Sequence, residues 1–509
     1  MQLSQKNINN IKAQPGLMIP DVKLFTLPEK VLQFGTGVLL RGLPDYFIDK
    51  ANRNGIFNGR IVVVKSTNTG GADAFAAQDG LYTLIVNGIE NGEPVHENII
   101  NASISRVLSA QDEWQKILDC ASNPDMQVII SNTTEVGITR GDDKISDTPP
   151  RTFPGKLLAF LYERFKVFNG SASSGMVIVP TELIPANGTL LRSIVLDMAR
   201  DNKLEKDFLD WLQEHNHFCN SLVDRIVPGP LSAEEKINTE KALGYQDDLM
   251  IMSESFRLWA IESGDASVKA KLSFAEADAG VVIAPDINKF RELKLRLLNG
   301  THTFSCGLAF LAGFDTVKEA MQDAAFSAFI EKLMTEEIAP ALLSVGITRE
   351  EACSFAAKVL DRFRNPSLEH HWLSITMQYS SKMKMRNLPL LERHYENNSE
   401  VPKLMALGFA AYILFMKNHD QNGHATGKKN GIEYAVRDDQ APWFAAVWEA
   451  AMEKDIASVV LGHSAYWETN LSHYPGFLEA VRLNLHTLQN EGARAVLNGL
   501  RQQTFSQQA

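Results

Sequence analysis

Cysteine is scarce in this chain: four occur among 509 residues. They lie far apart, and no C-x-x-C pair of the kind that holds a structural zinc ion is present. Such spacing suits a reducing compartment, where thiols stay unpaired. It disfavours a zinc-dependent alcohol dehydrogenase, and no metal site is expected.

Long apolar runs and basic clusters are also missing. No run approaches the ~20 residues that cross a bilayer, and the first residues, Met1–Lys6, are polar and lack the apolar core of an export signal. The net charge is −11, with no polybasic stripe. We therefore expect a cytoplasmic protein that binds neither membrane nor nucleic acid.

The composition that is present is that of a globular protein, with 45% hydrophobic and 22% charged residues. Its length predicts either two or three domains of ordinary size or two large domains. In the first half, residues 30–34 predict a buried strand, residues 38–53 a helix and residues 60–64 a second strand. Gly35 and Gly37 lie between that first strand and the helix. This βαβ unit is typical of a doubly wound parallel sheet.

Further strands are predicted along the first half. Residues 81–86, with the turn signals Asn87-Gly88 and Asn91-Gly92, indicate a β-hairpin. Residues 126–131 and 175–180 predict two more parallel strands, separated by a helix over 155–167, and both strands end in polar residues, at 131–135 and 181–182. The carboxyl ends of parallel strands are where α/β proteins bind ligands.

From Pro285 onward the sequence predicts helices without strands, and the polar stretch 418–429 is interpreted as a loop. We therefore predict a Rossmann-type dinucleotide-binding domain over 1–284 and an all-helical substrate and catalytic domain over 285–509. The predicted helices cover residues 289–312, 316–335, 348–363, 370–383, 401–417, 441–461 and 475–500.

The turn at Gly35 and Gly37 has the context of a dinucleotide fingerprint, where small residues let the backbone approach a pyrophosphate. Leu40 stands where the third glycine is expected, and Gly42 follows. A tight βα turn without a ligand is the alternative explanation of these residues. Lys65 occupies the place of the acidic residue that holds the adenosine ribose, so the choice between NAD and NADP stays open.

Lys294, Asn299 and His302 form the most distinctive polar set of the second half. Burial can lower the pKa of a lysine until its amine acts as a base, and Asn and His N–H groups can hold the oxygen of a reacting alcohol or ketone. Chance helix positions would also produce this spacing. The pairs His215/His217 and His370/His371 lack ligand partners at metal spacing and are interpreted as surface or core histidines.

Several segments together resemble the mannitol dehydrogenase family of long-chain polyol and hexuronate dehydrogenases. They are residues 33–41, 131–138, 185–188, 220–228, 290–303, 311–317, 362–366 and 467–468. The likeness covers nearly the whole chain and is greatest to the subgroup that interconverts D-tagaturonate and D-altronate with NAD. The resemblance therefore implies NAD as cofactor and a hexuronate or aldonate as substrate.

The resemblance also implies site residues. Lys294 is the expected general acid/base, with Asn299 and His302 holding the reacting oxygen, in a cleft between the domains. The expected substrate ligands are Asn187, Asp224 and Arg362; an ion pair of Asp224 with Arg225 and a helix-end charge for Arg362 are the alternatives. The expected cofactor contacts are Phe34, Gly35, Thr36, Gly37, Val38, Leu39, Arg41, Lys65, Asn132 and Thr133.

Three other functions stay open on the sequence. Sibling enzymes acting on fructuronate or on mannitol would share the Lys-Asn-His set. A catalytically silent nucleotide-binding or sensor protein would be expected to have lost part of that set, which is intact here. The oligomeric state is not determined by the sequence, and the resemblance is compatible with a monomer.

Overall fold

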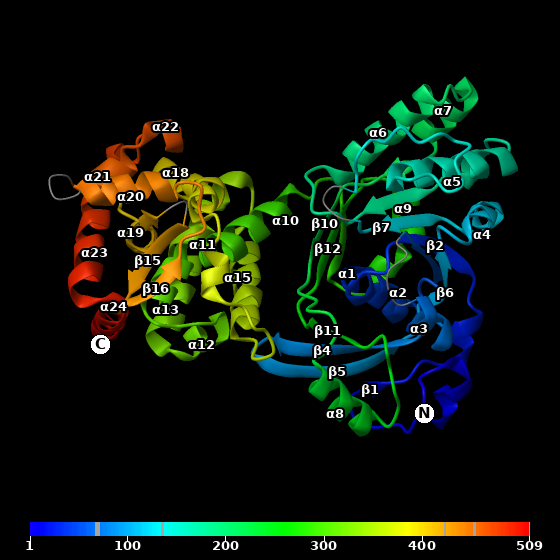
Figure 1. Ribbon diagram of the computed structural model, residues 1–509, viewed down its shortest axis with the longest axis horizontal. Coiled ribbons are helices and arrows are strands. Elements are labelled where there is room, and N and C mark those ends of the chain that lie inside the picture. Colours follow the sequence, from blue (N-terminus) through cyan, green and yellow to red (C-terminus); the bar gives the residue numbers. More distant parts are fainter. Residues whose placement is uncertain (67–71, 134–136, 422–423, 451–454, 508–509) are drawn as a thin grey trace. The chain divides into compact units, whose positions relative to one another are not determined.

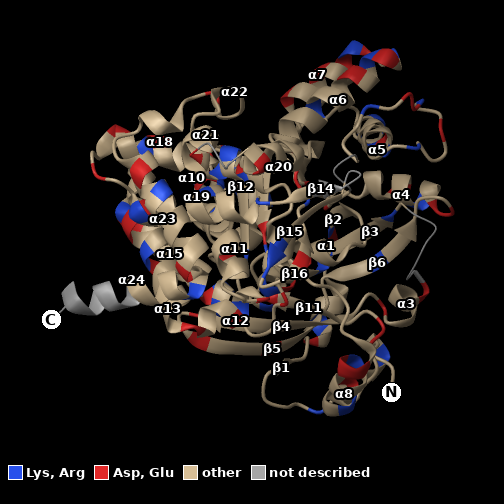
Figure 2. Ribbon diagram, turned by 60° about the vertical axis from the view of Figure 1, so that its left-hand side comes forward, with Lys and Arg blue, Asp and Glu red and all other residues tan. Residues whose placement is uncertain are grey.

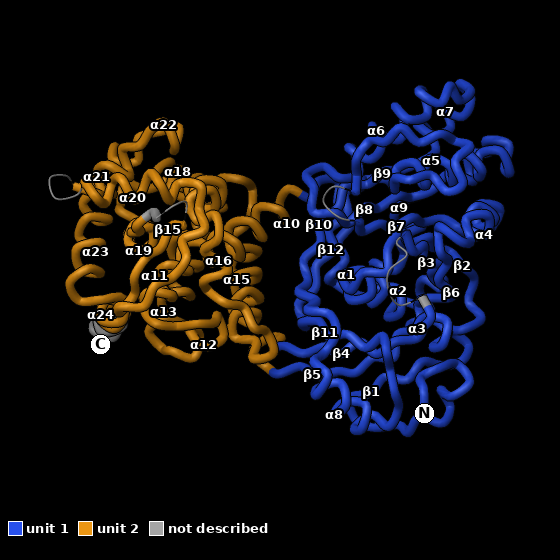
Figure 3. The backbone as a smooth tube through the Cα atoms, viewed as in Figure 1, with its two compact units in different colours: residues 1–88, 94–287 blue, residues 89–93, 288–509 orange. Residues whose placement is uncertain are grey.

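The computed structural model describes residues 1–66, 72–133, 137–421, 424–450 and 455–507, so residues 134–136 of the segment 131–138 lie outside it. The chain forms two compact units: residues 1–88 with 94–287, and residues 89–93 with 288–509 (Figure 3). The domain predicted over 1–284 included residues 89–93. This hairpin tip belongs to the second, where the Gly92 N–H donates to Asp361 Oδ2 at 3.3 Å.

A six-stranded sheet forms the centre of unit 1, and every pair of its neighbouring strands is parallel (Figure 1). Numbered along the chain, the strand order is 3-2-1-4-5-6, the doubly wound arrangement of dinucleotide-binding domains. The predicted fold class is confirmed. In order across the sheet the strands are β6 (Ile104–Ser109), β3 (Arg60–Lys65), β2 (Glu29–Phe34), β7 (Val128–Ser131), β8 (Val177–Pro180) and β9 (His217–Phe218).

Side chains alternate between two cores on the faces of this sheet, since successive residues of a strand point to opposite sides. Val31 and Ile61 join one core, while Leu32 and Val62 join the other. Burial of both faces explains the continuous apolar runs of β2 and β3. The first core is covered by α1 (Val38–Gly42), α2 (Pro44–Arg53) and α9 (Ala266–Lys271), and the second by α4 (Trp114–Asp119), α5 (Phe153–Val167), α6 (Asn187–Asp201) and α7 (Lys206–Glu214).

The helix predicted over 38–53 is two helices, so that prediction was wrong in one respect. Leu43, between α1 and α2, has φ −133° and ψ −76°. Pro44 follows it and lacks an N–H, and a residue before proline is pushed out of the α region. The break ends α1 after five residues.

The predicted hairpin is confirmed, and it belongs to a separate sheet of order β1-β5-β4-β11. Its turn is at Asn91 and Gly92, both with positive φ, as tight hairpin turns require. A third sheet has the order β10-β12-β13. The remaining elements of unit 1 are β1 (Leu17–Met18), β4 (Tyr82–Glu90), β5 (Glu93–Asn101), β10 (Ser221–Asp224), β11 (Ile251–Glu254), β12 (Leu258–Glu262), β13 (Val281–Ala284), α3 (Ala72–Ala77), α8 (Ala233–Leu243) and the 3₁₀ turns η1 (Gln5–Asn10), η2 (Val22–Thr26), η3 (Cys120–Ser122), η4 (Ala172–Ser174) and η5 (Ser273–Ala277).

Unit 2 is mainly helical, as predicted (Figure 1). Its helices are α10 (Asn288–Leu293), α11 (Thr301–Leu311), α12 (Val317–Gln322), α13 (Ala324–Lys332), α14 (Ala339–Ala341), α15 (Arg349–Arg364), α16 (Trp372–Ile375), α17 (Tyr379–Lys382), α18 (Leu388–Asn397), α19 (Lys403–Phe415), α20 (Ala441–Glu449), α21 (Ile456–Leu461), α22 (Ser464–Trp467), α23 (Phe477–Glu491) and α24 (Ala493–Gln507), with 3₁₀ turns η8 (Leu343–Val345) and η11 (Leu471–His473). Among the described residues, none of these helices is both long and apolar enough to cross a membrane.

Unit 2 also contains a small antiparallel sheet, which corrects the prediction of a loop over 418–429 and of a second half without strands. Its strands are β14 (His419–Gln421), β15 (His424–Lys429) and β16 (Ile432–Ala435). Asn430 and Gly431 form the turn between β15 and β16, again with positive φ. The strands are largely polar because most of their side chains are exposed, and Tyr434 anchors them by donating to Phe415 O.

Three helical segments of unit 2 have the wider π geometry, in which the hydrogen bonds run from residue i to i+5. They are η6 (Lys294–Gly300), η7 (Leu333–Ile338) and η9 (Met383–Asn387). Two of them are held together by Arg296 of η6, whose Nη1 donates to Met385 O and Arg386 O of η9. The π segment η6 contains Lys294 and Asn299 of the predicted proton-transfer set, and His302 follows in α11.

Candidate functional site

The glycine turn follows β2 at the point where the strand order reverses, between β2 and β7. Gly35 has φ +126°, which side chains disfavour, and a Cβ there would lie 3.0 Å from Asn132 O and 2.9 Å from Leu40 Cδ1. The sequence needs glycine here because the end of β7 passes directly over the turn. In open α/β sheets this switch point is where ligands bind.

The two glycines that follow have different roles. Gly37 is the N-cap residue of α1, and a Cβ built on it would meet nothing within 4 Å, so the backbone at the start of α1 faces open space. A Cβ on Gly42 would lie 2.8 Å from Val227 Cγ2. Gly42 thus permits the close packing of the helix that the third glycine of the fingerprint usually provides. It stands two positions after residue 40, where that glycine is expected.

The other predicted cofactor residues of this turn are placed differently. Thr36, Val38 and Leu39 are partly exposed, whereas Phe34 is buried and its ring lies 5.1 Å from that of Phe153. Arg41 points inward: its Nη1 donates to Leu249 O at 2.6 Å, and its guanidinium lies over the rings of Phe75 and Tyr82. This geometry does not support a contact between Arg41 and a cofactor phosphate.

Lys65 ends β3, where Rossmann domains usually carry the acidic ribose ligand. It is 8% exposed, and its carbonyl accepts from Ala110 N at 2.8 Å. The acidic side chain that would repel the 2′-phosphate of NADP is therefore replaced by a lysine.

Polar residues at the ends of β7 and β8 are bonded to one another. Glu182, which is buried, accepts from Thr133 N and Thr133 Oγ1 at 2.9 Å, and from Ser131 Oγ at 3.1 Å. Asn132 Nδ2 donates to Thr181 O and Oγ1. Glu182 thus fixes the loop that carries Asn132 and Thr133. The sequence showed it as a polar strand end without indicating this role.

Asn187 is saturated by the backbone. Its Nδ2 donates to the carbonyls of Pro180, Glu182 and Ser221, and its Oδ1 accepts from the N–H groups of Gly188 and Ser221. An amide has two N–H groups and two lone pairs, so no capacity remains for a substrate hydroxyl. The geometry favours a positioning role over the predicted substrate contact. Asp224, the other substrate ligand predicted in unit 1, is buried at the end of β10.

In unit 2 the π segment η6 aligns two of the three predicted catalytic residues. Lys294 and Asn299 are five positions apart, which is one hydrogen-bonded turn of a π-helix and would be about 140° of rotation in an α-helix. The wider turn therefore brings both side chains towards one face, and both are partly exposed. The helix then continues into α11, where His302 is the second residue.

His302 is 9% exposed and is surrounded by rings. It stacks on Phe363 with centroids 4.1 Å apart, and the rings of His370 and Trp372 meet it edge-on at 5.2 and 5.9 Å. Burial lowers the pKa of His302 well below its ordinary value, and nearby cations lower it further. Its Nε2 has no hydrogen-bond partner among the described residues. A neutral imidazole with an unused ring nitrogen is thus held at the site.

The cations that act on His302 are Arg362, Arg386 and Lys382, which we name the cation cluster, and His370 acts on His302 in the same direction when protonated. Arg362, the predicted substrate ligand, is buried in the last turn of α15. Arg386 Nη1 donates to Thr303 Oγ1, next to His302, at 3.3 Å. The helices α11 and α16 are in contact, as are α15 and η6. The structure therefore brings Arg362 and His302 together with two cations that the sequence analysis did not select.

The signal for those two residues was present but ambiguous. Lys382 and Arg386 are four positions apart in a run that also contains Lys384, a pattern usually explained by a solvated helix face. Lys384 fits that explanation, because its Nζ lies 2.8 Å from the exposed Glu468 carboxylate.

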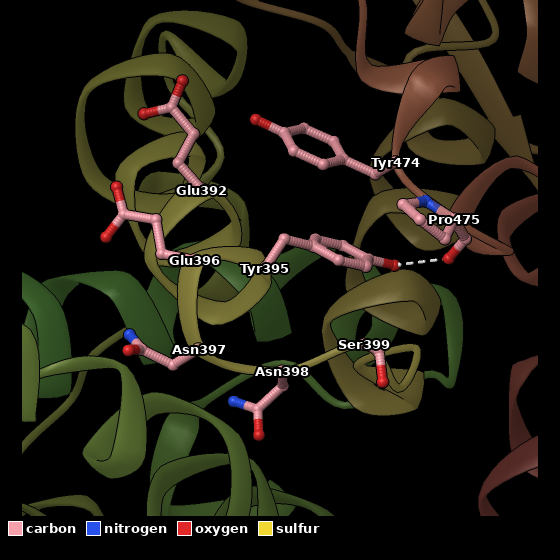
Figure 4. Close-up of a pocket in the computed structure, with 8 residues that line it drawn as sticks. All are labelled: Glu392, Tyr395, Glu396, Asn397, Asn398, Ser399, Tyr474 and Pro475. Carbon is pink, nitrogen blue, oxygen red and sulfur yellow. Dashed lines mark hydrogen bonds between the residues drawn. The ribbon is translucent and has the colours of Figure 1, made fainter.

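Unit 2 contains a groove of about 830 Å³ with a different set of lining residues (Figure 4). It is lined by Glu392, Tyr395, Glu396, Asn397, Asn398, Ser399, Tyr474 and Pro475. The rings of Tyr395 and Tyr474 stack at 4.8 Å. None of the predicted site residues lines this groove. The described residues also contain no group of three or more His, Cys, Asp or Glu side chains that could hold a metal ion.

Comparisons with known proteins cover nearly the whole chain. Residues 29–273 match the family model of the mannitol dehydrogenase Rossmann domain, and residues 286–489 match that of the mannitol dehydrogenase C-terminal domain. The altronate oxidoreductase of Bacillus subtilis (strain 168) is 39% identical over 476 residues, which are 92% of this chain and 95% of that protein. The altronate oxidoreductase of Shigella flexneri is 38% identical over 93% of this chain and 97% of its own length.

Two solved structures share the fold. Pseudomonas fluorescens mannitol 2-dehydrogenase, solved as a ternary complex with NAD and D-mannitol, is 24% identical with a TM-score of 0.64, over 99% of this chain and 100% of its own. A substrate-free D-sorbitol dehydrogenase is 20% identical with a TM-score of 0.77, over 97% of this chain and 100% of its own.

Proposed function

Because the chain belongs to the mannitol dehydrogenase family and is an oxidoreductase acting on CH–OH groups, we propose that it interconverts D-tagaturonate and D-altronate with NAD(H). The observation that carries this proposal is the similarity to altronate oxidoreductases at 37–39% identity over more than nine-tenths of the chain. The cation cluster around His302 supports it, because a hexuronate carries a carboxylate that a polyol lacks.

Unit 1 has the features that a bound dinucleotide needs. Three features suit a pyrophosphate: the close approach of the backbone at Gly35, the open space above Gly37, and the first N–H groups of α1, which have no acceptor within the helix. The loop of Asn132 and Thr133, fixed by Glu182, ends the neighbouring strand. When bound, NAD(H) supplies or accepts the hydride. The glycine turn binds it, and Asn132 and Thr133 line its position at the strand ends.

Lys294, Asn299 and His302 of unit 2 manage the proton and the developing charge. In the reduction direction the Lys294 ammonium donates a proton to the carbonyl oxygen, and in oxidation the neutral amine takes the hydroxyl proton. N–H groups of Asn299 and His302 hold that oxygen, a contribution of about 2.7–4 kcal/mol per donor in comparable sites. The low pKa of His302 keeps its ring neutral, so Lys294 is the group that changes charge.

Parallel assays of NADH oxidation with D-tagaturonate, D-fructuronate and D-fructose test the substrate. We expect kcat/KM to be highest with D-tagaturonate. A preference for D-fructuronate or D-fructose would assign the chain to a sibling activity, and no turnover with any of the three would favour a silent nucleotide-binding protein.

The cofactor choice is tested separately at Lys65. Since a lysine stands where an acid would repel a 2′-phosphate, we expect Lys65→Asp to lower the activity with NADPH relative to that with NADH. Lys12→Asp is the matched charge control, as Lys12 is exposed and far from the predicted turn in the sequence. An unchanged cofactor ratio in Lys65→Asp would remove Lys65 from the cofactor site.

A further inference from the structure

Glu182 is a buried carboxylate whose partners in the described part of the chain are all neutral. It follows β8 and is 3% exposed. Its Oε1 accepts from Thr133 N and Thr133 Oγ1, and its Oε2 accepts from Ser131 Oγ. Among the residues that the structure describes, no Lys, Arg or His lies within ion-pair distance of it. Burying a charge without an opposite charge is costly, and neutral donors offset that cost only in part.

This carboxylate lies beside the dinucleotide turn. Glu182 bonds to Thr133, and the carbonyl oxygen of the preceding Asn132 is 3.0 Å from the position that a Cβ on Gly35 would take. Asn132 N also donates to Phe34 O, at the end of β2, at 3.2 Å. The carboxylate therefore stands next to the switch point between β2 and β7, where doubly wound sheets bind their ligands.

The two oxidation states of a nicotinamide dinucleotide differ in charge at the nicotinamide ring. The ring of NAD⁺ carries a positive charge, and the ring of NADH is neutral. A fixed anion attracts such a charge more strongly in a buried site than in water, because the effective dielectric constant is lower. A ring bound near these strand ends would therefore be attracted to Glu182 mainly in its oxidised form.

We propose that Glu182 provides the negative charge that strengthens the binding of NAD⁺ relative to NADH in unit 1. This inference rests on the cofactor of the proposed function and not on its sugar. In the reduction of a ketone, the hydride with its electron pair passes from NADH to the carbonyl carbon, a proton from Lys294 goes to the carbonyl oxygen, and the ring becomes cationic. Glu182 stabilises that cation and so favours the reductive direction.

Titrations with NADH and NAD⁺ test this inference in Glu182→Gln, which keeps the size of the side chain and removes its charge. Binding of NADH is followed by its fluorescence, and binding of NAD⁺ by displacement of NADH. We expect Kd for NAD⁺ to rise about tenfold, with Kd for NADH within about twofold of the wild-type value. A residue that only fixes the loop would weaken both complexes alike, so an unchanged ratio of the two Kd values overturns the inference.

Three further variants separate the charge of Glu182 from its hydrogen bonds. Glu182→Asp keeps the charge and should keep the ratio near the wild-type value, as should Ser131→Ala, which removes only a donor to the carboxylate. Glu182→Asn repeats the neutral substitution, so the test does not depend on the folding of one variant. Glu29→Gln is the matched control, because Glu29 pairs with Arg106 at the amino end of β2, the opposite end of the same sheet.

The titrations also distinguish this inference from the proposed function, because they need no sugar. If the wild type turns over no hexuronate but Glu182→Gln shifts the ratio of the two Kd values, the role of Glu182 stands and the proposed activity fails. If D-tagaturonate is reduced but the ratio stays the same in both neutral variants, the proposed activity stands and the inference fails. Failure of the wild type to bind either dinucleotide also overturns the inference.

Discussion

At the scale of single residues, the site is defined by which polar groups are satisfied and which are not. The side chain of Asn187 has its hydrogen bonds taken by the backbone. His302, in contrast, keeps an unused ring nitrogen although it is buried. An unsatisfied buried group usually costs about 1–3 kcal/mol. A substrate oxygen that bonds to the free ring nitrogen of His302 would remove this cost.

Lys294→Met should lower kcat by about 10²- to 10⁴-fold, the usual contribution of a positioned acid or base. NADH affinity should stay the same, because the dinucleotide turn belongs to unit 1. Stopped-flow NADH oxidation and fluorescence titration with NADH measure the two quantities. Lys289→Met is the control, since Lys289 is paired with Glu351. Normal turnover in Lys294→Met would remove the lysine from the mechanism.

The low pKa of His302 predicts a pH dependence of stability. In the unfolded chain histidine takes up a proton near pH 6.5, whereas folded His302 does so only at much lower pH. Below pH 6.5 the unfolded state therefore binds more protons, and the free energy of unfolding falls by up to about 1.4 kcal/mol per pH unit. The stability from this group is complete above pH 6.5 and is lost on acidification.

Urea unfolding of His302→Phe between pH 8 and pH 5 measures this effect. We expect a shallower loss of stability below pH 6.5 than in wild type, with a remainder from His370, whose pKa is also lowered. His486→Gln is the control because His486 is exposed. An acid profile of His302→Phe identical to that of wild type would contradict the prediction.

At the scale of elements, π geometry decides what a helical pattern alone could not. The sequence predicted a helix over 289–312, and one is present, but an α-helix would separate Lys294 from Asn299 by about 140°. The π geometry of η6 makes that separation smaller. Because a π turn differs from an α turn by one residue, apolar periodicity does not reveal it.

The π segment η7 supports another helix in the same unit. Glu337 is 8% exposed, and its two carboxylate oxygens accept from Leu404 N at 2.8 Å and Met405 N at 2.7 Å, at the start of α19. Glu337→Ala should leave these N–H groups unpaired and lower the free energy of unfolding by about 1–3 kcal/mol. Urea denaturation measures it, with the exposed Glu336→Ala as control. Equal stability of the two variants would show that Glu337 is not required.

At the scale of the whole molecule, two compact units divide the chemistry: the Rossmann sheet of unit 1 carries the dinucleotide turn, and unit 2 carries Lys294, Asn299, His302 and the cation cluster. In unit 1, Lys residues alternate with Asp and Glu along α7 and α8 (Figure 2). Ion pairs such as Lys206 with Asp210 and Lys236 with Asp248 join these charges.

The dinucleotide turn can be tested through the stability of the whole chain. NADH at a hundred times its Kd should raise the free energy of unfolding by about 2.7 kcal/mol. Gly35→Ala should abolish this increase, since a Cβ would meet Asn132 O and Leu40. Gly244→Ala is the control: Gly244 also has positive φ, but a Cβ there meets nothing within 4 Å. Stabilisation of Gly35→Ala by NADH would exclude this turn as the binding site.

The sequence predicted four of the six strands of the parallel sheet and most helices of the second half, because apolar periodicity and glycine turns are local signals that each segment carries alone. It did not predict β6, β9 or α18. Several motifs that follow one another along the chain also indicated the mannitol dehydrogenase family. The sequence did not show β14 to β16, whose polar strands lack an apolar pattern, nor the break at Leu43 that Pro44 imposes. The tertiary structure alone decided that Asn187 and Arg41 turn to the backbone and that Lys382 and Arg386 gather beside His302. Such outcomes depend on contacts between residues distant in sequence, because these contacts decide how far a side chain is buried and which charged groups surround it.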